Sequence, residues 1–134
     1  ASPVVKEVIT TTNAPAALAS YSQAIRAGNM LFCSGCIGMD PKSGNLVSGG
    51  VEAECEQVLK NLQAVVEAGG SSMENVLKTT VFLTTMDNYA KVNEIYLKYF
   101  NKNPPARSCV AVAGLPRGCL VEIEAVALIT GSKL

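Results

Sequence analysis

The run CLVEIEAVALI at residues 119–129 gives the clearest indication of how the chain folds. Apolar residues occupy every second position, which is the period of a strand with one face in a core: Val121, Ile123, Ala125, Ala127 and Ile129. The opposite face carries two carboxylates, Glu122 and Glu124, and becomes apolar a few residues later. The run therefore predicts a strand that is buried on one face and carries two carboxylates on the other.

Five further runs upstream have the β-branched or alternating composition of strands. They lie at residues 4–10, 22–26, 30–36, 76–84 and 106–113. The second and third flank Ala27, Gly28 and Asn29, where the glycine can supply the positive φ of a hairpin turn. The chain is therefore expected to form a sheet of about six strands.

Two segments change to the helical period. Between Val51 and the Gly69–Gly70 stop, apolar residues share one stripe: Val51, Cys55, Val58, Leu59, Leu62, Val65 and Val66. After Asp87, which is expected to cap a second helix, the stripe continues through Tyr89, Val92, Ile95, Tyr96, Tyr99 and Phe100 until Pro104–Pro105 excludes further helix. Two helices can cover one face of such a sheet, so the expected architecture is a single α+β domain over residues 1–134, with the other face polar or covered by another subunit.

Composition narrows the possible chemistry. The 134 residues include 11 Lys+Arg, 11 Asp+Glu and no histidine. The missing histidine excludes Ser-His-Asp and Cys-His catalysis, histidine zinc sites and a two-histidine ribonuclease mechanism. Zero net charge argues against nucleic acid or an anionic membrane as an obligatory partner. With 49% hydrophobic and 16% charged residues, one hypothesis is that apolar surface is buried between subunits.

Five cysteines, an odd number, favour free thiols in a reducing compartment, and we expect a cytoplasmic protein with no membrane-spanning or secretory segment. Cys33 and Cys36 form a Cys-x-x-Cys motif, but the surrounding run reads as a strand, in which residues three apart point to opposite faces. We therefore interpret these cysteines as buried apolar residues rather than as a redox pair, and expect no metal and no cofactor.

Arg107 is the most unusual charge, because its neighbours in the predicted strand are small or apolar. A half-buried guanidinium requires an anion, which is either a structural salt-bridge partner or the carboxylate or phosphate of a substrate. Glu122 and Glu124 also allow two interpretations: a solvated strand end, or a carboxylate that faces Arg107 or a pocket and positions a water molecule. Tyr21, in a loop of small residues, and Ser34–Gly35, inside a strand, are weaker signals of a ligand site.

These residues belong to a series of motifs that occur in the order and at the spacing of one family. The motifs are NAPAA at 13–17, YSQA at 21–24, SG at 34–35, GMDP at 38–41, KTTV at 78–81, VNEIY at 92–96, PARSC at 105–109 and IEAV at 123–126. Over nearly its whole length the chain resembles the reactive intermediate deaminase (RidA) family, also called the YjgF/YER057c/UK114 family. The PARSC block, followed by LPRG and VEIEA, is the most specific part of this resemblance.

The resemblance implies a chorismate-mutase-like fold assembled as a homotrimer with a barrel-like core and clefts between subunits. It also implies hydrolysis of 2-imino acids such as 2-iminobutanoate and 2-iminopropanoate, released by pyridoxal-phosphate enzymes, to 2-keto acids and ammonia. By the same resemblance, Arg107 holds the substrate carboxylate and Glu122 orients the attacking water. Tyr21, Ser34 and Gly35 match pocket residues, and Cys109 the pocket wall. Lys78 and Asn93 are expected to be structural.

The chain departs from the family pattern at two places. Ala19–Ser20 precedes Tyr21 where the family usually has Gly-Pro, and Cys36 stands in place of a glutamine. Both changes affect the expected pocket and its substrate preference, and neither removes Arg107 or Glu122. Two other functions stay open at this point: an endoribonuclease that inhibits translation, and a non-enzymatic, chaperone-like trimer that binds ligands.

Overall fold

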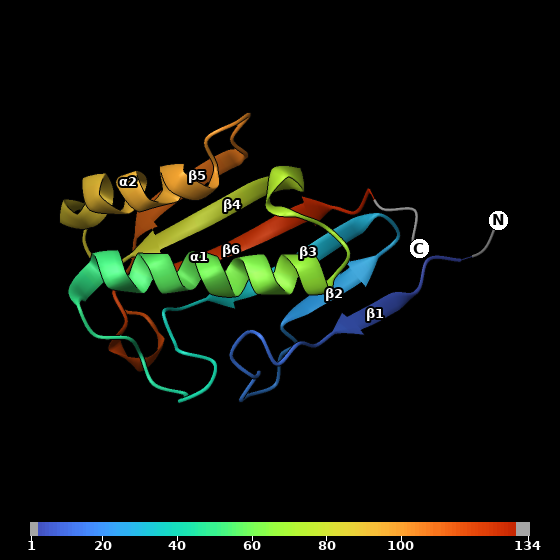
Figure 1. Cartoon of the computed structure of the whole chain (residues 1–134), viewed down its shortest axis with the longest axis horizontal. Helices are drawn as coiled ribbons and strands as arrows, with labels where there is room; N and C mark the ends of the chain where they lie inside the picture. Colours follow the sequence, from blue (N-terminus) through green and yellow to red (C-terminus); the bar gives the residue numbers. More distant parts are fainter. Residues whose placement is uncertain (1–2, 131–134) are drawn as a thin grey trace.

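The computed structural model describes residues 3–130, which form one mixed sheet and two helices (Figure 1). The strands are β1 (Lys6–Ile9), β2 (Ala24–Ala27), β3 (Met30–Cys36), β4 (Val76–Leu83), β5 (Ala106–Ala111) and β6 (Val121–Leu128). The helices are α1 (Gly50–Ala68) and α2 (Tyr89–Tyr99), and three short 3₁₀ turns, η1 (Met73–Asn75), η2 (Met86–Asn88) and η3 (Pro116–Gly118), complete the elements. The α+β class and all six predicted strands are confirmed.

The sheet has the order β1-β2-β3-β6-β4-β5, so β6 lies between the two halves of the chain. All neighbouring pairs are antiparallel except β4 and β5, which are parallel and are connected by α2. The alternation along β6 is confirmed, because its predicted apolar face is fully covered, with Val121, Ile123 and Ala127 each 0% exposed. Strand β6 is therefore the centre of the core.

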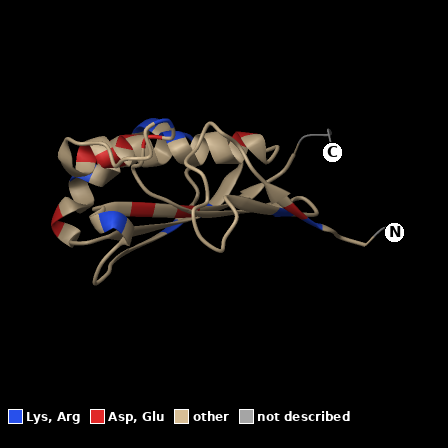
Figure 2. Cartoon of the chain, turned by 90° about the horizontal axis from the view of Figure 1, so that it is seen from below, with Lys and Arg blue, Asp and Glu red and all other residues tan. Residues whose placement is uncertain are grey.

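Both helices pack on that face of the sheet (Figure 2). The whole predicted stripe of α1 is buried, and the helix ends at Ala68, before Gly69 and the positive-φ Gly70. The core members of α2 are Val92 and Tyr96. The expected cap at Asp87 is wrong: Thr85 accepts the Asp87 N–H and opens η2, and Asn88 precedes α2.

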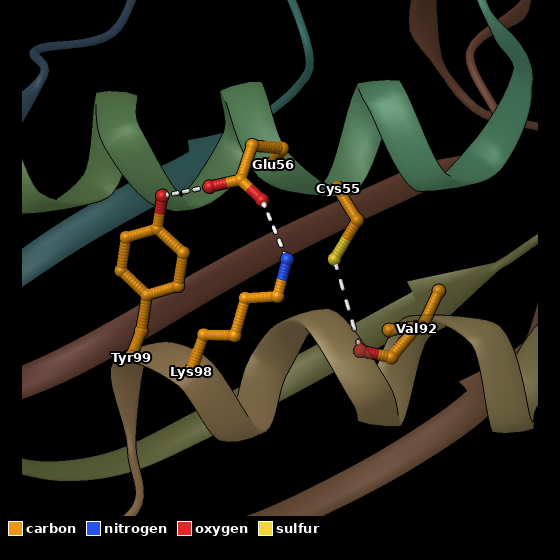
Figure 3. A network of polar contacts seen from close by, with 5 residues as sticks. All are labelled: Cys55, Glu56, Val92, Lys98 and Tyr99. Atoms are coloured by element: carbon orange, nitrogen blue, oxygen red, sulfur yellow. Dashed lines mark hydrogen bonds and ion pairs between the residues drawn. The ribbon is translucent and has the colours of Figure 1, made fainter.

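The two helices are also joined by polar contacts near the ends of α2 (Figure 3). The Tyr99 hydroxyl donates to Glu56 of α1, and the Lys98 ammonium lies 3.8 Å from the same carboxylate. The Cys55 thiol donates to the carbonyl of Val92 over 3.9 Å. These contacts align α2 along α1, and with it the residues that α2 holds above β5.

The other face of the sheet carries no helix (Figure 2). The strand register aligns one apolar row across it, formed by Val8, Ile25, Phe32 and Val126. Phe32 is 47% exposed and Val8 60% exposed, so this row faces outward. Of the two expectations for this face, polar or covered by another subunit, its apolar row favours the second. No helix within residues 3–130 is both long enough and apolar enough to cross a membrane.

Candidate active site

Strand β3 contains a β-bulge at its C-terminal end. Cys33 pairs with Ala125 of β6 and Cys36 with Ile123, so Ser34 and Gly35 together oppose Glu124. The extra residue reverses the alternation. The expectation that Cys33 and Cys36 point to opposite faces is therefore wrong, since Cys33 lies in the core and Cys36 packs against it.

The bulge brings the backbone of Gly35 against the carboxylate of Glu122. A Cβ added to Gly35 would overlap that carboxylate, 2.8 Å from Cδ and 3.0 Å from Cγ. Only glycine allows this approach. The group that approaches Gly35 is the Glu122 side chain.

A cavity of about 80 Å³, here called the bulge pocket, lies beside this contact. Three of the predicted site residues, Tyr21, Ser34 and Gly35, line it together with apolar side chains such as Leu18 and Ile37. Ser34 donates its hydroxyl proton to the carbonyl of Ser22 over 2.6 Å, which ties the loop before β2 to the bulge. Cys36 also lines the pocket, so the family departure at this position changes its wall.

The Glu122 carboxyl is suited to accept a proton. Burial raises its pKa above the usual glutamate value, and the charge of Glu124, two residues along the same face, raises it further. A base whose pKa lies closer to the working pH is the more effective catalyst. Glu122 does not itself line the bulge pocket, and its link to that pocket is the contact with Gly35.

Arg107 lies elsewhere, on β5 beneath α2. Its Nη1 donates to Asn93 Oδ1 over 2.7 Å and its Nη2 to the Tyr89 hydroxyl over 2.9 Å. The guanidinium carbon lies 4.8 Å from the ring centre of Tyr96 and 5.5 Å from that of Tyr89, both within cation-π range. We call Arg107, Tyr89, Asn93 and Tyr96 the arginine cluster.

Every group that holds Arg107 is neutral. Across residues 3–130, the ion pairs join Arg26 to Glu7 and Lys98 to Glu56, and none includes Arg107. The structural salt bridge considered above is therefore not formed within the described chain. A permanently charged, half-buried guanidinium with neutral partners is arranged to bind an anion from outside.

Arg107 and Glu122 are not brought together within one chain. Arg107 is in register with Thr79, whose hydroxyl lies 2.7 Å from that of Tyr96 beneath α2. Glu122 is in register with Phe82 and lies on the face that carries no helix. The expectation that a carboxylate faces Arg107 is thus not met within the chain. Glu122 and the arginine cluster, the two halves of a possible site, thus lie on opposite faces of one sheet, and the bulge pocket reaches α1 through Asn61 and Val65.

The remaining predicted residues divide between these halves. Cys109 follows Arg107 by two positions on the same face of β5, and burial raises its thiol pKa while the Arg107 charge lowers it. Asn93 was expected to be structural but contacts Arg107 directly, and Tyr89 was assigned to the core stripe but is 37% exposed. The spacing of Tyr89 and Asn93, one turn apart at the start of α2, is the only sequence signal for their shared role.

The cysteine motif has no reactive character in this structure. Burial raises the pKa of Cys33 to about 12 and that of Cys36 to about 12, so both thiols are protonated at neutral pH. Among residues 3–130, all five cysteines are free, and no group of three His, Cys, Asp or Glu side chains gathers at metal-binding distance. The interpretation of the two cysteines as buried apolar residues is consistent with this geometry.

The chain is similar over most of its length to known proteins and solved structures. The chain is 50% identical over 127 residues to a mouse protein named 2-iminobutanoate/2-iminopropanoate deaminase, covering 95% of this chain and 94% of the relative. A crystal structure of a Thermotoga maritima protein superposes with a TM-score of 0.92 at 51% identity, over 95% of this chain and all of that one. The crystal structure of Escherichia coli TdcF with bound serine superposes with a TM-score of 0.89 at 37% identity, over 92% of this chain and 99% of that one. The family model described as endoribonuclease L-PSP matches residues 11–129, and the chain belongs to this family.

Proposed function

We propose that this protein is a 2-imino acid deaminase, which hydrolyses 2-iminobutanoate and 2-iminopropanoate to 2-keto acids and ammonia. The observation that carries the proposal is the guanidinium of Arg107, half-buried and held by neutral groups alone. Such a group binds a planar carboxylate through two parallel hydrogen bonds. Relatives about 50% identical to this chain bear the deaminase name, and the Escherichia coli relative was solved with serine, an amino acid that carries the same carboxylate.

The reaction uses only groups that this chain offers. Arg107 binds the substrate carboxylate and so places the imine carbon. Glu122 takes a proton from a water molecule as its oxygen forms a bond to that carbon, and the C=N electron pair moves to nitrogen, which takes up a proton. The amino group of the tetrahedral intermediate then takes up a second proton, the C–N bond breaks to release ammonia, and the hydroxyl group loses its proton as the C–O bond becomes the keto group. Neither a cofactor nor a metal is needed for any of these steps.

The active site in this proposal forms between subunits of a homotrimer. Two observations support that assembly: Arg107 and Glu122 lie on opposite faces of one sheet, and the face with Glu122 carries an exposed apolar row. A second copy that covers this face would place its own Arg107 near the bulge pocket. The five cysteines of this chain are free, which is consistent with a reducing compartment, and we place the protein in the cytoplasm.

A coupled assay tests the reaction. A dehydratase generates 2-aminoacrylate or 2-aminocrotonate, and release of the keto acid is followed with and without this protein. We expect acceleration by the wild type and a loss of at least about 100-fold in kcat/KM for Arg107→Ala, because a hydrogen-bonded charge pair with the substrate is removed. Arg26→Ala, which removes an arginine paired to Glu7 at the far edge of the sheet, is the control and should retain activity. Full activity of Arg107→Ala would refute the proposal.

Endoribonuclease activity is the second candidate, and the description of the family favours it. Zero net charge and the absence of histidine count against it, since RNA binding depends on cationic surface. RNA cleavage that copurifies in proportion to the protein and is lost in Arg107→Ala would support this candidate. Suppression of aggregation of a client protein that survives Arg107→Ala would instead favour the chaperone-like function.

A further inference from the structure

Tyr89 occupies a position that its sequence pattern does not explain. It is the first residue of α2, with its side chain 37% exposed, while the other tyrosine of the arginine cluster, Tyr96, is 6% exposed. Its hydroxyl accepts a hydrogen bond from Arg107 Nη2 over 2.9 Å. The phenol thus contacts the guanidinium from the N-terminal end of α2 while part of its surface stays exposed.

The hydrogen bonds of this cluster leave several donors unused. A tyrosine hydroxyl accepts and also donates, and the Tyr89 oxygen is already an acceptor for Arg107. Among residues 3–130 the Tyr89 hydroxyl accepts this hydrogen bond and donates none. Arg107 has five N–H groups, of which Asn93 and Tyr89 each engage one. The cluster therefore presents three N–H groups and one O–H group without partners in the described chain.

We propose that Tyr89 is a substrate-binding residue, whose hydroxyl donates to the same carboxylate that Arg107 holds. This inference rests on the proposed function. A carboxylate has about four acceptor positions, so it can take two N–H bonds and one O–H bond at once. The bond from Arg107 to the Tyr89 oxygen also polarises the hydroxyl and makes its proton a better donor.

Because Tyr89 is uncharged, it can contact Arg107 without competing with the substrate carboxylate. A carboxylate at the same position would pair with Arg107 and compete with the substrate, whereas a phenol holds the guanidinium in place and leaves its charge available. The contact is made to the part of the substrate that does not react. Tyr89 should therefore contribute equally to binding in the ground state and in the transition state, and should affect KM rather than kcat.

Tyr89→Phe tests the inference, because it removes the hydroxyl and keeps the ring that faces Arg107. Tyr99→Phe is the matched control: it makes the same substitution in the same helix, and its hydroxyl contacts Glu56 outside the arginine cluster (Figure 3). Three quantities are measured for both variants and the wild type: kcat and KM in the coupled assay, and the dissociation constant of pyruvate by calorimetry. We expect Tyr89→Phe to raise both KM and the pyruvate dissociation constant about tenfold, with kcat within about twofold of the wild type. Tyr99→Phe should leave all three within about twofold.

The outcomes separate this inference from the proposed function. A deaminase whose Tyr89→Phe variant binds pyruvate as well as the wild type overturns the role of Tyr89 and leaves the proposed function standing. An equal loss in both variants also overturns it, because the effect would then come from a shift of α2. In a third outcome, the wild type binds pyruvate, Tyr89→Phe weakens that binding tenfold, and the wild type does not deaminate. The role of Tyr89 is then retained and the proposed function is refuted. A wild type with neither property refutes both.

Discussion

Glu122 combines a raised pKa with a place in the proposed site. Burial and the charge of Glu124 both disfavour its ionised form. For a carboxyl whose pKa is higher in the folded than in the unfolded protein, protonation stabilises the fold. That stabilisation is complete below the usual pKa of glutamate, about 4.3, and is lost as the pH rises through the raised value. The group proposed to activate water is thus also a group that weakens the fold at neutral pH.

Glu122→Gln should therefore separate stability from activity. Glutamine resembles the protonated carboxyl at every pH, so the variant should unfold at a higher temperature than the wild type at pH 7 and at a similar temperature at pH 4. It should lose at least about 100-fold in kcat, because no base remains at this position. Thermal unfolding followed from pH 4 to pH 8 measures the difference. A gain in stability that does not change over this range would contradict the predicted titration.

The sequence identified the two charged residues of the site but not the residues that hold Arg107. Arg107 and Glu122 stand out because each is a charge within an apolar strand. Tyr89 and Asn93 do not, since an aromatic residue at helical spacing is explained equally well by the core, and a polar one by solvent. Their role depends on how α2 crosses β5, which is a tertiary contact that no local pattern reports.

The bulge in β3 is the structural element on which the position of Glu122 depends. It places the Gly35 backbone against the Glu122 carboxylate and opens the bulge pocket beside Ser34. Bulges of this kind direct a side chain away from its regular position in the sheet.

Gly35→Ala should displace Glu122 without unfolding the protein. The new methyl group would overlap the carboxylate, which has to turn away, while the core face of β3 is unchanged. Since a displacement of about 1 Å can cost about 100-fold in rate, we expect a 10- to 100-fold loss in kcat/KM. Gly114→Ala, a change of the same kind where the added Cβ meets no atom within 4 Å, is the control. The activity and the melting temperature of both variants are measured. Normal activity of Gly35→Ala would show that the contact between Gly35 and Glu122 is not needed for catalysis.

Most elements were predictable because their periods are strong, and the exceptions have local causes. The stripe of α1 and the alternation of β6 each give one unambiguous buried face. The bulge was missed because a two-residue period assumes a regular strand, so Cys33 and Cys36 were assigned to opposite faces. Asp87 was misassigned as a cap because Thr85, two residues earlier, offers the same chemistry and takes that role for η2.

At the scale of the whole molecule, the proposed trimer assigns the two halves of the proposed site to different copies of the chain. In a ring of three identical subunits, each interface joins two different surfaces, so one subunit can supply Arg107 and its neighbour Glu122. Two inactive variants should then complement each other.

Coexpression of Arg107→Ala with Glu122→Gln tests this arrangement. In a ring of three that contains both chains, one of the three interfaces places an intact Arg107 opposite an intact Glu122, so the isolated mixed assemblies should recover about a third of wild-type activity. The two chains carry different affinity tags, and assemblies that contain both are isolated before the assay. The control is a mixture of the separately purified variants, which should stay inactive. Activity in mixed assemblies no higher than in the single variants would mean that each chain forms its own site.

The place of β6 in the sheet has a consequence for how the protein is synthesised. The strand that joins β3 to β4 follows every other strand in the chain, so a ribosome completes both halves of the sheet before it makes their common partner. Until residues 121–128 emerge, β3 and β4 each have an unpaired side and the inner face of α1 lacks part of its packing. Folding of the sheet is thus delayed until this strand has been made, and the unpaired strand edges are open to chaperones and proteases until then. A chain terminated before Val121 would lack the centre of its core and not merely its last strand.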